Sequence, residues 1–214
     1  TIFGGVDVQR ITLLDGGLQT EVISVRPLEI DNHSRDSFDI RYTANREVIT
    51  ESFEISEGVV ISPGDYSFDE YGFDFSTGSQ REFFGNLSFR TGEFFDGDRL
   101  ALRGGLTWAP SKYFRAGVSY DFNDVDLPHG GFVVRLVTLR VEMIFSSTLS
   151  WVNLVQYDNV SEVAGINSRL HWIPQAGREI FLVLNHMLQD TDRNDSFHSS
   201  QADMTIKMNY TFRF

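Results

Sequence analysis

Apolar and polar residues alternate along the last thirteen positions of the chain. The even positions are apolar: Ala202, Met204, Ile206, Met208, Tyr210, Phe212 and Phe214. The odd positions are polar or charged: Asp203, Thr205, Lys207, Asn209, Thr211 and Arg213. A period of two puts successive side chains on opposite faces of a β-strand. An apolar face backed by one with both signs of charge favours a transmembrane β-barrel strand, lipid outside and water inside. The edge of a soluble sandwich is the alternative.

The same alternation predicts about thirteen strands and no helix. The predicted strands are 6–13, 18–30, 38–44, 48–55, 65–77, 83–90, 99–108, 114–122, 133–145, 149–157, 166–172, 180–188 and 202–214. A tight turn is expected at 44–47, where the alternation of 38–44 ends, a hairpin at the Asp-Gly-Asp of 96–98, and a loop over 123–131, which is rich in Asp, Pro and Gly. The pattern is weaker over residues 1–57 than over 58–214.

Short and long connections alternate from Asp65 onward. The short ones are at 76–81, 110–112, 146–148 and 173–177, and the long ones at 123–131, 158–165 and 189–200, with the 96–98 hairpin as an exception. Outer-membrane barrels show this pattern, and in bacteria their strand number is even. An odd count therefore means that one strand is misassigned or that the barrel begins upstream of Thr1. In the second case an upstream segment or a partner chain must complete the wall, because open edges in lipid leave backbone groups unpaired.

Composition narrows the choice of fold and partner. No stretch approaches the ~20 apolar residues of a transmembrane helix, whereas barrel strands need only about ten. The chain has no cysteine, which excludes disulfides, thiolate metal sites and cysteine nucleophiles. The net charge of −12 argues against nucleic acid as a partner, since phosphate backbones attract basic surfaces.

In the strands that alternate regularly, the charged residues occupy the polar positions and therefore share one face. As candidate lumen-facing residues we take Arg90, Arg103, Arg115, Asp121, Arg140, Glu142, Arg169, Lys207 and Arg213. They would either select anionic solutes or bind sugars in an open channel, or pair with one another across a narrow lumen and fill it. The candidate lipid-facing residues are Met204, Ile206, Met208, Tyr210, Phe212 and Phe214. Aromatics near strand ends, such as Trp108 and Tyr113, are expected to form a membrane-interface belt.

The sequence offers little for catalysis. Acidic pairs such as Asp124 with Asp126, or Asp190 with Asp192, supply oxygens suited to calcium, but they lack the pattern of a calcium loop and are expected to be solvated. The five histidines form no zinc-binding pattern, and no nucleophile elbow or phosphate-binding glycine loop occurs. We therefore predict no enzyme activity, no metal and no cofactor.

Eight short segments occur in an order that resembles a known family. They are VVISPGDYSF (59–68), FFDGDR (94–99), LTWAPS (106–111), YDFNDVDLPHG (120–130), LVQYDNVS (154–161), SRLHWIP (168–174), EIFLVLNH (179–186) and KMNYTFRF (207–214). Together they resemble the C-terminal β-barrel region of the DUF5916 family of bacterial outer-membrane proteins. Members of that family often carry an N-terminal family-9-like carbohydrate-binding module, which this sequence lacks, and the resemblance supplies no catalytic residues.

The prediction is an all-β, antiparallel transmembrane β-barrel of the outer-membrane type, taking residues 1–214 as the C-terminal part of a larger barrel. It would lie in the outer membrane of a Gram-negative bacterium as a porin-like scaffold or channel, passing small or carbohydrate-related solutes or anchoring a partner. The expected partners are the lipid bilayer, lipopolysaccharide and, through the C-terminal strand, the barrel-assembly machinery. The alternative is a soluble carbohydrate-binding β-sandwich.

Overall fold

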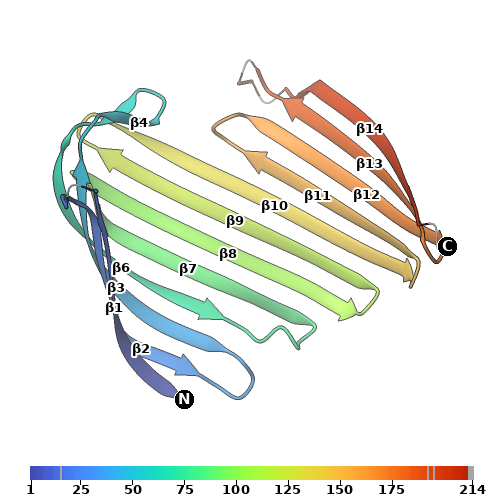
Figure 1. Cartoon of the computed structure of the whole chain (residues 1–214), viewed down its shortest axis with the longest axis horizontal. Helices are drawn as coiled ribbons and strands as arrows, with labels where there is room; N and C mark the ends of the chain where they lie inside the picture. Colours follow the sequence, from blue (N-terminus) through green and yellow to red (C-terminus); the bar gives the residue numbers. More distant parts are fainter. Residues whose placement is uncertain (15, 192, 195, 212–214) are drawn as a thin grey trace. The chain divides into compact units, whose positions relative to one another are not determined.

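The computed structural model describes residues 1–14, 16–191, 193–194 and 196–211 (Figure 1). The fold is all-β and antiparallel, with 79% of residues in strands. The strands are β1 (Ile2–Thr12), β2 (Leu18–Asp31), β3 (Ser37–Ile49), β4 (Phe53–Ser56), β5 (Val59–Ile61), β6 (Gly64–Ser76), β7 (Phe83–Phe94), β8 (Gly97–Ser111), β9 (Phe114–Leu127), β10 (Gly130–Ser146), β11 (Leu149–Asp158), β12 (Val163–Gln175), β13 (Arg178–Gln189) and β14 (His198–Tyr210). The described residues include no helix that is long and apolar enough to cross a membrane.

Twelve of these strands form one sheet, in which each strand pairs with its neighbours in chain order. The order is β1-β2-β3-β6-β7-β8-β9-β10-β11-β12-β13-β14, and β4 and β5 pair only with each other. Within the described residues β1 and β14 are the outer strands and the sheet is not closed. The predicted all-β antiparallel fold is therefore confirmed, whereas closure into a barrel stays a prediction.

The odd strand count came from the region after Ala44. The predicted turn at 44–47 is wrong, because β3 continues through it to Ile49 while paired with β6. The predicted strand 48–55 is also wrong: its second half begins β4, which turns back to pair with β5 in a separate hairpin. With this segment removed, the large sheet has an even number of strands.

The loop predicted at 123–131 is mostly strand. β9 continues to Leu127 and β10 begins at Gly130. The backbones of β8 and β9 approach each other closely in this Asp-rich stretch, because a Cβ at Gly97 would collide with the carbonyl oxygen of Asp126. The longest connections are 50–63, which contains β4 and β5, and 190–197, which lies within the long loop predicted at 189–200.

The chain divides into two compact units, which are described separately. The first comprises residues 1–78, 85–104 and 121–134, and the second 79–84, 105–120 and 135–214. Directly paired residues of neighbouring strands point to the same face of a sheet. The register therefore sorts the side chains of each unit into two faces.

In the first unit one face is apolar over part of each strand. Phe38, Ile40 and Tyr42 of β3 pair with Phe75, Phe73 and Tyr71 of β6, and the last two pair in turn with Phe89 and Thr91 of β7. We call this the apolar face of the first unit. Ring contacts continue across it, with Phe73 5.6 Å from Phe89 and Tyr42 5.2 Å from Tyr71 between centroids. Tyr71 and Phe75 are nonetheless more than a third exposed.

Buried apolar side chains are few and lie in the first unit. Among the described residues only Val59, Ile61, Phe68, Val125 and Leu127 are buried hydrophobics. Val59 and Ile61 come from β5, and they pack with Val125 and Leu127 of β9 in one cluster. The core of the first unit is therefore the contact between the β4–β5 hairpin and the large sheet.

Candidate functional site: the charged face and its hairpin

The opposite face of the first unit carries a row of ion pairs, and we call it the charged face. Arg41 Nη2 lies 3.4 Å from a carboxylate oxygen of both Asp39 and Asp74, and Arg90 Nη2 lies 2.5 Å from Asp74. Arg90 also donates to the carbonyl oxygens of Phe73 and Phe89. Its side chain crosses Gly72, where an added Cβ would collide with it. The glycine therefore makes room for the arginine.

Two further pairs extend the row on β6, β8 and β9. Arg99 Nη2 lies 2.5 Å from Glu70, which is buried, and the Arg99 guanidinium sits 4.7 Å above the ring of Phe94. Arg103 pairs with Asp121. Opposite charges within hydrogen-bonding distance neutralise each other, so these arginines present a charge-balanced surface.

The second unit also has one polar face, which we call its polar face. Along β10 to β14 the register links Arg140, Leu154, Asn167, Asn185 and Asp203 as successive neighbours. A second row of paired residues on the same face starts at Glu142 and includes Arg169 and Thr205. Lys207, which pairs with Phe181, also lies on this face. Arg140 pairs with Glu142, 2.5 Å apart, and the two asparagines bond to each other at 2.5 Å.

The remaining candidate lumen-facing residues lie as follows. Arg90, Arg103 and Asp121 belong to the charged face through their ion pairs. Arg115 belongs to the second unit, with its guanidinium 5.9 Å from the ring centroid of Phe84. Arg213 lies outside the described residues. Pairing between neighbouring positions thus accounts for five of the nine candidates: Arg90, Arg103, Asp121, Arg140 and Glu142.

The candidate lipid-facing residues of β14 share one face with the apolar positions of β13. Met204, Ile206 and Met208 pair with Leu184, Leu182 and Ile180, and Tyr210 pairs with Arg178. This is the apolar face of the second unit, which continues on β12 through Leu170 and Trp172. All four β14 side chains are more than half exposed. Phe212 and Phe214 lie outside the described residues.

The candidate lumen-facing residues leave out five members of the charged face: Asp39, Arg41, Glu70, Asp74 and Arg99. A signal for all but Glu70 was present, because Asp39 and Arg41 alternate with Phe38, Ile40 and Tyr42, Asp74 lies between Phe73 and Phe75, and Arg99 alternates with Leu100 and Leu102. What alternation does not give is which strands become neighbours. Arg99 and Glu70 are 29 residues apart and meet only in the folded sheet.

The apolar face of the first unit gives way to polar residues along β3 and β6. Beyond Tyr42 and Tyr71 the same face carries Ala44 and Arg46, paired with Asp69 and Ser67. Arg46 donates to both carboxylate oxygens of Asp65, at 2.9 and 2.7 Å. These bonds hold the pKa of Asp65 below its usual value. Over the same length the charged face turns apolar through Tyr66 and Phe68.

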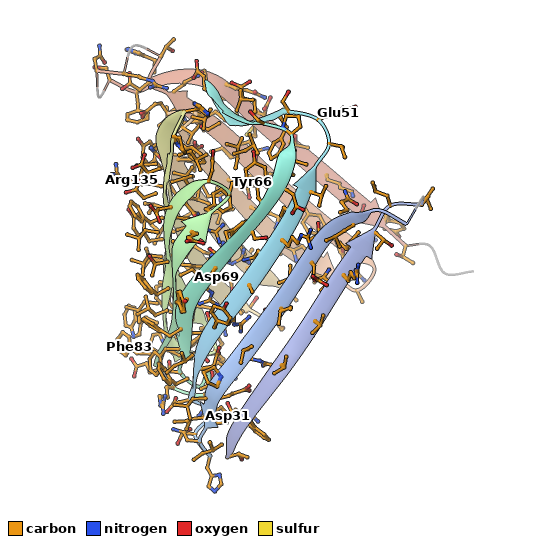
Figure 2. All side chains as sticks on the ribbon, turned by 90° about the vertical axis from the view of Figure 1, so that its left-hand side faces the viewer. Asp31, Glu51, Tyr66, Asp69, Phe83 and Arg135 are labelled. Carbon is orange, nitrogen blue, oxygen red and sulfur yellow. The ribbon has the colours of Figure 1, made fainter. Side chains whose placement is uncertain are left out.

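The β4–β5 hairpin covers this apolar end of the charged face. Phe68, which pairs with Asn45, is on the same face as Glu70, and its ring lies 5.8 Å from Phe94 and 5.5 Å from Phe95. Phe95 contacts Phe53 of β4 at 6.2 Å. Figure 2 shows Glu51, which precedes the hairpin, at the opposite end of the strands from Asp31. The hairpin is therefore held at one end of the first unit.

The acidic and histidine side chains of the described residues do not gather into a metal-binding cluster. No group of three or more His, Asp or Glu side chains there is placed to hold a metal ion. Asp190 is buried and accepts a hydrogen bond from the Asn194 amide, so its carboxylate is used within its own loop. The chemistry present is an ion-paired sheet face with an apolar hairpin docked on it.

In the comparisons with known proteins, no family model, no curated protein and no solved structure matches the chain. The resemblance to the DUF5916 family therefore stays a prediction.

Proposed function

We propose that the chain forms the wall of an outer-membrane β-barrel that acts as a channel or membrane-embedded scaffold. The observation that carries the proposal is the pair of apolar faces, which are formed by most strands of the large sheet and yet are widely exposed. Large contiguous apolar patches are rare on soluble monomers and mark contact with a partner or a membrane. In this proposal the apolar faces meet lipid.

The absence of a covering layer in the described residues supports lipid over a soluble sandwich. A sandwich needs a second sheet about 10 Å away to bury its apolar face. Among the described residues the only other sheet is the β4–β5 hairpin, and it packs on the charged face of the first unit. No second sheet of the described residues therefore covers the apolar face of the first unit.

Aromatic side chains at strand ends fit the same proposal. In the second unit the Trp108 ring stacks 6.0 Å from Phe83 and contacts Phe114 at 5.4 Å, while its indole N–H donates to Glu82. Trp108, Phe83 and Tyr113 are exposed. An aromatic body with a hydrogen-bonded polar tip is suited to the membrane interface.

The charged and polar faces are suited to a water-filled lumen through which small or carbohydrate-related solutes pass. In lipid the free edges of β1 and β14 must be paired, because unpaired backbone groups there cost several kcal/mol each. They would pair with each other, or with strands from an upstream segment or a partner chain. In both cases the sheet would close into the predicted barrel.

Fractionation of bacteria expressing the chain behind an export signal tests the proposal. We expect the protein in the outer-membrane fraction, extracted only by detergent, with a gel mobility that changes on heating. A protein that stays soluble at high concentration without detergent would refute the barrel. Swelling of liposomes in sugar solutions then separates a channel, which admits the sugar, from a scaffold, which does not.

A further inference from the structure

We propose that the β4–β5 hairpin is an inward-folded loop that narrows the channel and, through its glutamates, makes it favour cations over anions. The inference rests on the proposed function and adds the loop that controls passage and the charge class of the solute. Three observations carry it: how the hairpin is held, which face it covers and what charge it brings.

The hairpin is held by buried contacts. Val59 and Ile61 are only 4% and 2% exposed, whereas Val60 between them is 44% exposed. This alternation means that β5 has one face packed on the sheet and one face open. The packed side meets Val125 and Leu127, with Phe94 and Phe132 around them. Buried apolar contacts of this kind keep a loop in place.

The partners of the hairpin identify the face that it covers. Val125 and Leu127 have the parity of Asp121, which pairs with Arg103 on the charged face. Phe68 shares that face with Glu70, the partner of Arg99. The hairpin thus lies over the face that the proposed barrel turns toward its lumen, next to the Arg99–Glu70 pair. A loop held there reduces the open cross-section.

The charge of the hairpin region is negative. The connection 50–63 contains Glu51, Glu54 and Glu57 and no lysine or arginine. Glu54 accepts a hydrogen bond from the Gly58 amide, which fixes one carboxylate in the turn. The arginines of the charged face already pair with Asp39, Asp74, Glu70 and Asp121. The glutamates therefore add net negative charge at the narrowed position.

Carboxylates at a constriction attract cations and repel anions, because low-dielectric walls focus their field. This reverses the expectation from the arginine-rich sequence pattern, which suggested anionic solutes. The paired arginines of the charged face contribute little net field, whereas the hairpin glutamates add negative charge at the hairpin itself.

The test is the reversal potential of the refolded chain in planar bilayers across a tenfold KCl gradient. We expect the parent to favour potassium over chloride severalfold. The variant E51Q/E54Q/E57Q should lose most of this preference, since glutamine keeps the Gly58 contact but not the charge. The matched control E51D/E54D/E57D keeps the charge and should remain cation-selective. An anion-selective parent, or glutamine and aspartate variants that behave alike, would overturn the proposal.

A second variant replaces residues 51–62 with a short Gly-Ser turn. Its single-channel conductance should rise at least twofold, because the hairpin no longer fills the lumen. Heat-modifiable mobility checks that this variant still folds. Unchanged conductance in a folded variant, or silence of both proteins after insertion, would mean that the hairpin is not the constriction. A parent that never inserts would refute the proposed function itself.

Discussion

Replacing Ile206 by arginine would test directly whether the apolar face of the second unit meets lipid. Ile206 pairs with Leu182 and has Met204 and Met208 on either side of it along the same face. Its side chain is 57% exposed. An arginine at the bilayer midplane of a barrel costs about 2–4 kcal/mol, which lowers the folding equilibrium constant roughly 30- to 700-fold. At an equally exposed site in water, the change costs no more than about 0.5 kcal/mol.

The matched control is Thr205→Arg, one position earlier in β14 and on the opposite face, where Thr205 pairs with Val183. We expect this variant to lie within about 0.5 kcal/mol of the parent, because its side chain would face water. Both free energies come from urea titrations of the protein refolded in lipid vesicles. Equal effects of the two substitutions would refute the lipid assignment, whether both are small or both are large.

Three further predictions follow from single contacts. Ile61→Ala should cost about 2–5 kcal/mol of local stability, measured as protease cleavage at the β4–β5 hairpin, while Val60→Ala on its open side should leave the cleavage rate unchanged. Gly97→Ala should lower the urea midpoint, because its Cβ would collide with the Asp126 carbonyl oxygen. Burial alone would raise the pKa of Asp158, but hydrogen bonds from Ser161 and Val160 outweigh it and lower the pKa. The folded state therefore binds a proton at Asp158 less readily than the unfolded state, so the ionised carboxylate stabilises the fold at neutral pH and this stabilisation is lost as the pH falls below about 4. Asp158→Asn should therefore lose less stability than the parent between pH 7 and pH 3, measured as the urea midpoint at each pH.

The side-chain facing of the strands was the part of the fold that the sequence predicted best. Residues 166–172 alternate cleanly, and the register places Ile166, Leu170 and Trp172 on one face as expected. The two strands with apolar residues on both sides, 149–157 and 180–188, had no predictable facing. Pairing resolves it: Leu182 lies opposite Ile206, and Val183 lies opposite Thr205.

The candidate site was only partly predictable, because its pairs depend on which strands are neighbours. Arg90 was expected on the polar side, but its partner Asp74 lies 16 residues away on β6. The hairpin was missed for a different reason. Its run of apolar residues, Val59 to Ile61, is too short to distinguish a strand from a loop. Val125 and Leu127, which pack against Val59 and Ile61, are brought there only by folding of the sheet.

The error at 44–47 and the position of the hairpin have one physical cause. A barrel strand needs about 9–11 residues to cross a bilayer, whereas β3 and β6 have 13 each. Past Tyr42 and Tyr71 the environments of the two faces exchange: the apolar face becomes polar and the charged face becomes apolar. The regular alternation of residues 38–44 ends at this exchange, and an analysis that assumes one fixed apolar face interprets the end of the alternation as a turn. In the folded sheet the strands continue, and the newly apolar side is the surface on which Val59 and Ile61 pack. The extension beyond the proposed membrane band is therefore what gives the hairpin its binding surface, and a chain with shorter strands would have nowhere to hold it.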